Sequence, residues 1–371
     1  MSEDVSDDYG LSHISPADKI AAPELDYRPR DPASYRPAIG LIGCGGISAY
    51  HLAAYRAAGY NVVALCDLHE DRARDRQAHY YPQADIYTDY RDLLRRDEIE
   101  VLDIATHPHD REPIIEAALL ARKHVLSQKP FVLDLDFGER MVELADRQGV
   151  RLAVNQNGRW APHFAYIRQA VASGLLGQLT SACLTVHWDH SWIIGTPFED
   201  IHDLVLYDFA IHWFDILTCF FGARQPQRVF GSTARASGQR GRPPMLAQVQ
   251  IDYEDAQASL FFNAAVTYGQ EDRAYLAGTQ ASVVSAGPSL SDQTVTLYTP
   301  SGYSVPALEG TWFRDGFHGT MAELLCAIEE RRAPSNAAHG NLHSLALAFA
   351  AIASAHEGVA KVPGEVRRLP T

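Results

Sequence analysis

The stretch that decides the fold reads AIGLIGCGGISAYHLAAYRAAGYNVVALCD and covers residues 38–67. It predicts a short buried strand at 38–42, a glycine turn at 43–48, a helix that ends at Gly59, and a second apolar strand at 61–67. A helical connection between two such strands implies that they run parallel in one sheet, with a right-handed crossover. The N-terminal half is therefore predicted to be an α/β domain.

The same alternation of strands and helices continues to about residue 157. The apolar stretches EVLDIAT (100–106), KHVLSQKP (123–130) and VRLAVNQN (150–157) predict further strands, and helices are expected between them. This pattern is typical of a doubly wound Rossmann domain, here predicted over 38–157, which binds its ligand at the carboxyl ends of the parallel strands.

The second half of the chain has a different pattern. Between about residues 179 and 300, segments that mostly alternate apolar and polar residues are separated by turn residues, as in an antiparallel sheet. One helix at 205–222 interrupts this series, and two more close the chain. We predict an α+β domain over 158–371 with a large, open-faced, mostly antiparallel sheet.

Residues 1–37 are expected to form an arm. The segment is acidic at its start and ends in LDYRPRDPASYRP (25–37), where the prolines prevent a continuous helix or a central strand. Two interpretations remain open: a disordered tail, or an extended segment that lies over a neighbouring subunit.

The composition is that of a globular protein, with 46% hydrophobic and 21% charged residues in 371. A formal net charge of −14 argues against nucleic acid or an anionic membrane surface as a partner, because both attract dense basic patches. No apolar run has the length of a membrane span or a signal core, and the five cysteines have no paired spacing. We expect a cytoplasmic protein with free thiols.

The glycine turn has the form G-x-G-x-x-(small residue) between a strand and a helix. Gly43 allows the tight turn, Gly45 lets the backbone approach a pyrophosphate, and Gly46 and Ile47 lead into the helix at the small Ser48. A glycine-rich surface turn is the alternative interpretation. The strand before the turn and the helix after it favour dinucleotide binding.

Asp67 ends the second strand, about twenty residues beyond the glycines, where a carboxylate accepts hydrogen bonds from the adenosine ribose. Its negative charge favours NAD over NADP. NADP stays possible, because Arg72 and Arg74 follow closely and an arginine can bind a 2′-phosphate. The alternative role for Asp67 is to cap the helix that follows it.

Beyond the glycine turn, four ordered segments resemble the glucose-fructose oxidoreductase and inositol dehydrogenase family (Gfo/Idh/MocA). They are IATHPHDREPIIEAALLARKHVLSQKP (104–130), VNQNGRWAPHF (154–164), YDFAIHWFD (207–215) and HGNLHSLALAFAAIASAHEG (339–358). The likeness covers residues 38 to about 358. It implies a nicotinamide-dependent oxidoreductase that acts on a carbinol of a sugar, sugar derivative or cyclitol.

Matched position by position, the family's catalytic residues fall on Lys129, Asp208 and His212. Residues four apart share one helix face, so Asp208 and His212 can converge on one hydroxyl. We expect His212 to be the base, Asp208 to orient it and Lys129 to stabilise the alkoxide. A buried core histidine is the alternative for His212. Asp215 is expected to support the helix or touch the substrate.

The resemblance also assigns cofactor contacts to Thr106, His107, His109, Gln128 and Asn157, in addition to Lys129. Two stretches within residues 104–130 depart from the family pattern. Gln128 stands where the family has Glu before Lys-Pro, and Thr106-His107-Pro108-His109 replaces its usual Pro-Asn loop. An amide at 128 can still donate and accept hydrogen bonds.

Substrate contacts are expected from two further segments. The resemblance places Arg159 and Trp160 at the cleft, and aromatic and imidazole side chains at His187, His190 and Trp192 suit the apolar faces and hydroxyl rim of a sugar. Trp188 in the same segment is expected to be core. A metal site built from His187, His190 and His202, or from His107 and His109, is the rival interpretation, and we expect none.

The combined prediction is an NAD(P)-dependent sugar or polyol dehydrogenase. Two alternatives remain: an enzyme that retains NAD and uses it transiently for elimination or glycoside cleavage, and a non-catalytic NAD-binding regulator. A large apolar sheet face that is left in water promotes aggregation, so we expect a second subunit to cover it in a homodimer or homotetramer.

Overall fold

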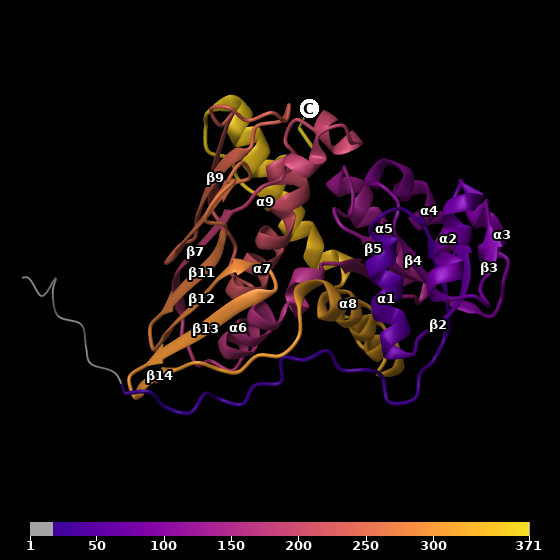
Figure 1. Cartoon of the computed structure of the whole chain (residues 1–371), viewed down its shortest axis with the longest axis horizontal. Helices are drawn as coiled ribbons and strands as arrows, with labels where there is room; N and C mark the ends of the chain where they lie inside the picture. Colours follow the sequence, from indigo (N-terminus) through magenta and orange to yellow (C-terminus); the bar gives the residue numbers. More distant parts are fainter. Residues whose placement is uncertain (1–17, 371) are drawn as a thin grey trace, which may run out of the picture.

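The computed structural model describes residues 18–370, which form two lobes joined side by side (Figure 1). One lobe holds a six-stranded parallel sheet and the other an eight-stranded sheet. The predicted fold class, an α/β Rossmann part followed by an α+β part, is confirmed.

The first sheet has the strand order β3-β2-β1-β4-β5-β6, in which every neighbouring pair is parallel. The order reverses between β1 and β4, so the carboxyl ends of these strands form the crevice in which doubly wound folds bind ligands. The strands are β1 (Ala38–Ile42), β2 (Asn61–Cys66), β3 (Asp85–Tyr87), β4 (Ile99–Ile104), β5 (His124–Gln128) and β6 (Leu152–Asn155).

The helices of this lobe are α1 (Ser48–Ala58), α2 (Glu70–Tyr80), α3 (Tyr90–Leu94), α4 (Pro108–Leu120) and α5 (Leu135–Gln148). A further helix, α8 (Trp312–Glu329), comes from the region predicted as the second domain. Its buried side chains, among them Phe317 and Met321, join the core under β1 and α1. The two lobes therefore share a helix, which ties the second half of the chain to the nucleotide-binding half.

The second sheet has the order β14-β13-β12-β11-β7-β10-β9-β8, and its only parallel pair is β7 with β10. Its strands are β7 (Leu179–His187), β8 (Arg228–Ala234), β9 (Leu246–Asp252), β10 (Gln257–Asn263), β11 (Glu271–Gly278), β12 (Ser282–Ser289), β13 (Asp292–Thr299) and β14 (Gly302–Ser304). One face of the sheet is buried under α6 (Pro162–Ala172), α7 (Ile211–Phe221) and α9 (Ala338–Glu357) (Figure 1).

Short helical turns join these elements. A 3-10 turn at Asn157–Trp160 leaves the first sheet, and two more, Ser191–Ile193 and Pro197–Asp200, follow β7. A π-helix at Val205–Phe209 then leads into α7. The single helix predicted over 205–222 is therefore divided in two.

The outer face of the second sheet is uncovered in the single chain. Phe230, Tyr275 and Tyr298 on this face are 46%, 39% and 45% exposed. Ser, Thr and Gln side chains such as Gln248 and Ser259 lie among them, together with charged side chains such as Arg228, Asp252 and Arg273. The face thus has exposed aromatic residues spread among polar and charged ones.

The described part of the arm, residues 18–37, lies against its own chain and spans both lobes (Figure 1). At one end Ile20 donates its N–H to the carbonyl of Tyr303 in the second sheet, at 2.8 Å. Further along, the backbone N–H groups of Ser34 and Tyr35 donate to Glu329 of α8. These residues are therefore extended, as one interpretation expected, and they contact their own chain; residues 1–17 lie outside the described part.

Among the described residues, no helix has the length and apolar character that crossing a membrane requires.

Candidate active site at the domain junction

The glycine turn follows β1 at the crevice of the first sheet. Gly43 has φ +99°, and a Cβ there would lie 2.9 Å from backbone atoms of Ala105 and Thr106, so only glycine fits. At Gly45 and Gly46 a Cβ would meet nothing within 4 Å. The backbone in front of α1 is therefore open to a ligand, as a pyrophosphate site requires.

The carboxylate of Asp67 lies beside this turn. It accepts the N–H of Cys44 at 2.8 Å and the N–H of His69 at 2.9 Å. The helix that follows starts at Glu70, with His69 as its N-cap residue, so Asp67 does not cap it. The carboxylate instead joins the end of β2 to the glycine turn and keeps lone pairs for a further donor.

Arg76 is a neighbour of the glycine turn that the sequence analysis missed. Its guanidinium donates to the carbonyl of Gly45 at 3.1 Å and to the Ser48 hydroxyl at 3.0 Å. Arg72, the residue named earlier as a possible phosphate ligand, is exposed on α2. The positive charge nearest the turn thus comes from one helical turn beyond the expected position.

The loops after β4 and β5 are held together by Arg111 of α4. Its side chain is 1% exposed and donates to the carbonyl of Thr106 at 2.7 Å and to the carbonyl of Pro130 at 2.8 Å. Burial lowers the pKa of Arg111 to about 10. This arginine, which gave no signal in the sequence, fixes the loop that carries Thr106 beside the loop that carries Lys129.

Lys129 reaches across the junction from β5 to the second lobe. Its Nζ lies 3.0 Å from the carbonyl oxygen of Asp208 and 3.1 Å from Asp208 Oδ1. Both side chains are largely buried, at 17% and 15% exposure. A charged pair with so little solvent contact is less screened than one at the surface.

Asp208, the partner of Lys129, lies in the π-helix, and His212 lies in the first turn of α7. Burial, and secondly the charge of Lys129, lower the pKa of His212 well below its usual value. Its Nδ1 has no hydrogen-bond partner, and its ring lies edge-on to Trp312 at 5.7 Å. Lys129 and Asp208 are therefore paired across the two lobes, and His212 lies four residues beyond Asp208, where the charge of Lys129 helps to keep its imidazole neutral.

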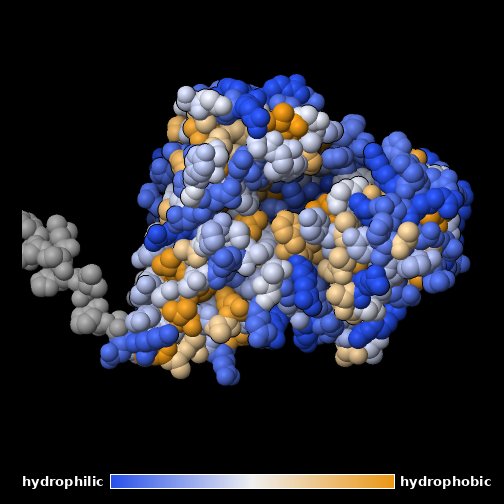
Figure 2. Space-filling view, in the orientation of Figure 1, coloured by the Kyte–Doolittle hydropathy of each residue, from blue (hydrophilic) through white to orange (hydrophobic). Residues whose placement is uncertain are grey.

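Aromatic and imidazole side chains from the loop after β7 line one side of the site. The ring of His190 lies 3.9 Å from that of Phe209, tilted by 46°. Burial lowers the pKa of His190 to about 3, with smaller effects from Asp189, which raises it, and Lys129, which lowers it. Trp192, 53% exposed, packs on Phe198, whose ring lies 6.0 Å from that of His107 in the first lobe. His190 and Trp192 therefore line the side of the junction that Lys129 faces. Figure 2 shows that the surface between the lobes is hollowed.

A buried polar network lies behind Lys129. His51 Nδ1 is 2.6 Å from Asp103 Oδ2, and both side chains are fully buried. Gln128 Nε2 lies 3.1 Å from His51 Nε2, while its Oε1 accepts the N–H of Lys129 at 2.7 Å. Since the amide nitrogen can only donate, His51 Nε2 is the acceptor and Nδ1 carries the proton.

This network changes the role expected for Gln128. The side chain is 5% exposed and both ends of its amide are occupied, so it positions the backbone of Lys129 rather than presenting a free group to a cofactor. Asn157 is similarly buried, and its Oδ1 accepts the indole N–H of Trp312 at 3.0 Å. Thr106 Oγ1 is buried without a partner, whereas His107 and His109 are exposed at the start of α4.

Two residues expected at the substrate lie elsewhere. Arg159 is 5% exposed and forms a two-pronged ion pair with Asp215 of α7, at 2.6 and 2.7 Å. Trp160 is packed against Gly319 of α8, where a Cβ would come within 2.2 Å of the indole. The geometry thus corrects both substrate assignments, and Asp215 takes the supporting role.

His187 is also misplaced by the sequence analysis. Along β7 the side chains alternate, so Val186 faces the core while His187 points to the open face, where its ring contacts Phe261 at 5.2 Å. It therefore cannot meet His190 around a metal. Trp188 packs on Trp213 at 5.8 Å, consistent with the expected core role.

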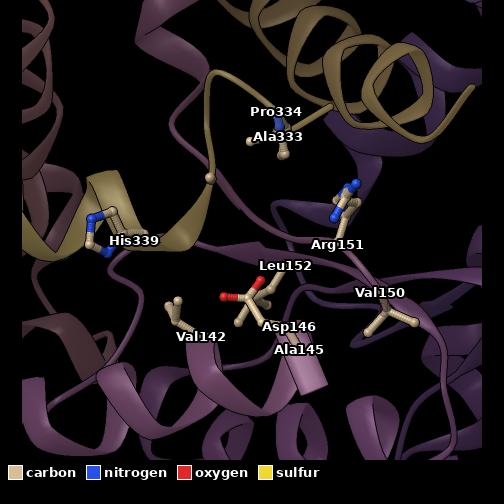
Figure 3. Close-up of a pocket in the computed structure, with 10 residues that line it drawn as sticks. Val142, Ala145, Asp146, Val150, Arg151, Leu152, Ala333, Pro334 and His339 are labelled. Carbon is tan, nitrogen blue, oxygen red and sulfur yellow. The ribbon is translucent and has the colours of Figure 1, made fainter. Parts of the chain in front are cut away.

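Two cavities lie away from these residues. One of about 360 Å³ is formed by the end of α5, the start of β6 and the segment before α9, with Asp146, Arg151 and His339 on its walls (Figure 3). The other, about 710 Å³, lies near the C-terminal half of α7. Neither includes Lys129, Asp208 or His212 among its lining residues.

The fold and the glycine turn define a dinucleotide-binding protein whose polar site spans two lobes. Residues 38–156 match the model of an oxidoreductase family with an NAD-binding Rossmann fold, and residues 164–284 match the GFO/IDH/MocA C-terminal domain. The chain belongs to the Gfo/Idh/MocA oxidoreductase family, as its sequence motifs predicted.

Known proteins of related sequence include the D-apiose dehydrogenase of Paraburkholderia graminis, 30% identical over 53% of this chain and 52% of that protein. The inositol 2-dehydrogenase of Burkholderia multivorans is 30% identical over 50% and 54%. The alignments thus span about half the length of these relatives. An oxidoreductase structure from Agrobacterium radiobacter, in complex with NAD⁺, L-tartaric acid and magnesium, has a TM-score of 0.80 at 20% identity, over 89% of this chain and 99% of that one. That likeness supports the fold.

Proposed function

We propose that this protein is an NAD(P)-dependent dehydrogenase that oxidises a carbinol of a sugar, a sugar derivative or a cyclitol, or reduces the corresponding ketone. The observation that carries the proposal is the ion pair between Lys129 and Asp208 across the two lobes, beside the neutral His212. The names of the relatives, an apiose and an inositol dehydrogenase, support the substrate class. Five free cysteines are compatible with a cytoplasmic protein.

The residues around the glycine turn fit a nicotinamide dinucleotide. Gly45 and Gly46 leave open backbone, Asp67 offers a ribose acceptor, and the buried Thr106 hydroxyl lacks a partner. When bound, the nicotinamide would accept or return the hydride. Asp67, directly after β2, would hold the adenosine ribose, and the ends of β1, β4 and β5 would hold the rest of the dinucleotide.

The side chains of the junction supply the proton chemistry. A carbinol loses its hydroxyl proton as hydride leaves the carbon, so the site needs a base at that oxygen. The neutral imidazole of His212 takes this proton, and the Lys129 ammonium donates a hydrogen bond to the oxygen as negative charge develops. Asp208 holds the ammonium in place through Oδ1 and its carbonyl. In the reductive direction His212 returns the proton.

Turnover tests the proposal directly. The protein is assayed against a panel of aldoses, branched pentoses and inositols with NAD and with NADP, while the absorbance of the reduced cofactor is followed. We expect steady formation of NADH with at least one compound. Product without accumulating NADH would instead indicate the enzyme that retains its cofactor for elimination, and binding of NAD without any turnover would indicate a regulator.

The pH dependence of oxidation should reflect the low pKa of His212. A base acts in its deprotonated form, so a lowered pKa keeps the base active as the pH falls. We expect kcat/KM to stay level through the usual histidine range near about 6.5 and to decline only at lower pH. Initial rates between pH 5 and pH 9 at saturating NAD check this, and a midpoint at or above the usual value would contradict it.

Asp67 should determine the cofactor preference. In Asp67→Ala the ratio of NADP to NAD turnover should rise by roughly tenfold or more, because a hydrogen bond to a charged group contributes about 1.5–3 kcal/mol and the repulsion of a 2′-phosphate disappears. The ratio is the informative quantity, since loss of the contact with Cys44 affects both cofactors alike.

Asp71→Ala, which removes another carboxylate, is the matched control for this measurement. Asp71 is exposed in the first turn of α2, and its removal should leave the cofactor ratio unchanged. An unchanged cofactor ratio in Asp67→Ala would show that the carboxylate serves only the glycine turn.

A homodimer or homotetramer that pairs the open sheet faces is proposed as the assembly. The exposed aromatic residues Phe230, Tyr275 and Tyr298 of that face support it. Light scattering should give a mass of two or four chains, and Tyr275→Lys at the centre of the face should shift it toward one. Tyr268→Lys, which alters an 89% exposed tyrosine outside the strands, should not. A monomeric parent protein would refute the proposal.

A further inference from the structure

Three potential metal ligands meet outside the proposed active site. His202 and Asp203 precede the π-helix, and His356 lies in the last turn of α9. One donor atom from each lies within 4.8 Å of the others. The sequence separates His356 from the other two by more than 150 positions, so only the fold brings them together.

The cluster has a fixed centre and an open side. The Asp203 side chain is only 8% exposed, and both of its oxygens contact His356 Nε2, at 3.0 and 3.1 Å. His202 is exposed, with its ring 6.1 Å from that of His356. The three side chains thus offer one carboxylate and two imidazole donors at one place, and the exposed side leaves room for water as a fourth ligand.

The donor types select the kind of ion. Imidazole nitrogen suits zinc, cobalt, nickel and copper, whereas magnesium and calcium prefer shells made of oxygen. Zinc bonds are about 2.0–2.2 Å long in a tetrahedral arrangement, which a rotation of the exposed His202 ring would allow. We propose that His202, Asp203 and His356 form a binding site for one divalent transition metal of the zinc class.

The position of the site links it to the catalytic segment. The carbonyl of Asp203 accepts the N–H of Tyr207 at 2.8 Å, and Tyr207 directly precedes Asp208 in the π-helix. A metal at this position would join the end of α9 to the start of that helix. Bound metal would thus stabilise the folded chain, because it binds the folded state alone.

The full-length protein, first stripped with a chelator, is titrated with Co²⁺ followed by its visible absorption and with Zn²⁺ followed by calorimetry. We expect one ion per chain and a higher melting temperature with Zn²⁺. His202→Ala should weaken binding by more than roughly a hundredfold, because even an outer-shell partner contributes about 10–100-fold. His202 is exposed and takes no part in the contact between Asp203 and His356, so this variant should fold normally.

The control is an exposed histidine pair on the same helix, His339 and His343, whose rings lie 5.7 Å apart. His343→Ala should bind metal like the parent protein, whereas His356→Ala should not. No binding by the parent protein at micromolar metal, or binding that His343→Ala abolishes and His202→Ala retains, would overturn the proposal. All of these readouts are independent of dehydrogenase activity.

Discussion

Replacing Lys129 by methionine should lower kcat by about 10²–10⁴-fold while the affinity for NAD stays near that of the parent protein. Methionine keeps most of the length of the side chain but removes the ammonium that lies 3.0 and 3.1 Å from Asp208. The developing alkoxide then has no cationic donor, and the largely buried Asp208 loses its partner. Steady-state rates and a fluorescence titration with NADH separate the two quantities.

Lys123→Met is the matched control for this variant. Lys123 is also a buried lysine of the first lobe, at 7% exposure, but its Nζ donates to the carbonyl of Arg96, away from the junction. It should affect stability and leave turnover per folded molecule unchanged. Near-parental kcat in Lys129→Met, with the best substrate from the panel, would remove the proposed mechanism.

Asp215→Ala should destabilise the protein by about 3–5 kcal/mol, the range seen when one partner of a buried ion pair is removed. The guanidinium of Arg159 is 5% exposed and would lose both contacts with the carboxylate. Asn341 and Ser344 of α9 also donate to Asp215, at 3.3 and 3.0 Å, and would lose this acceptor. Chemical unfolding followed by fluorescence measures the loss.

Two further variants test whether Asp215→Ala loses stability because it leaves a buried charge without a partner. Arg159→Met combined with Asp215→Leu should recover much of the lost stability, because an apolar pair avoids the unpaired charge. Glu143→Ala breaks an exposed pair with Arg147 and should change stability by less than about 1 kcal/mol. Equal effects of Asp215→Ala and Glu143→Ala would contradict the explanation.

Local sequence patterns predicted most of the fold because short apolar strands and a glycine turn carry their own signal. The patterns missed β3 and β14, each only three residues long, and the break between the π-helix and α7. They also placed α8 by its position in the chain, whereas its packing against the first sheet depends on contacts with residues far away in the sequence.

For the candidate site too, the sequence predicted some of the residues and missed others. Lys129, Asp208 and His212 were predicted through family motifs, and the geometry brings them together. The roles expected for Arg159 and His187 did not match their positions, because a motif does not reveal a partner 56 positions away or the face of a strand to which a side chain points. Arg111 and His51 were missed, since each acts only through contacts that the folded chain creates.

Residues 18–37 connect the two lobes through contacts with Tyr303 of β14 and Glu329 of α8. This arm lies on the side of the molecule opposite the hollow seen in Figure 2, and Asp31 on it contacts both Tyr60 of the first lobe and His318 of α8. Because the arm covers that side, substrate and product would reach Lys129 and Asp208 from the hollow between the lobes.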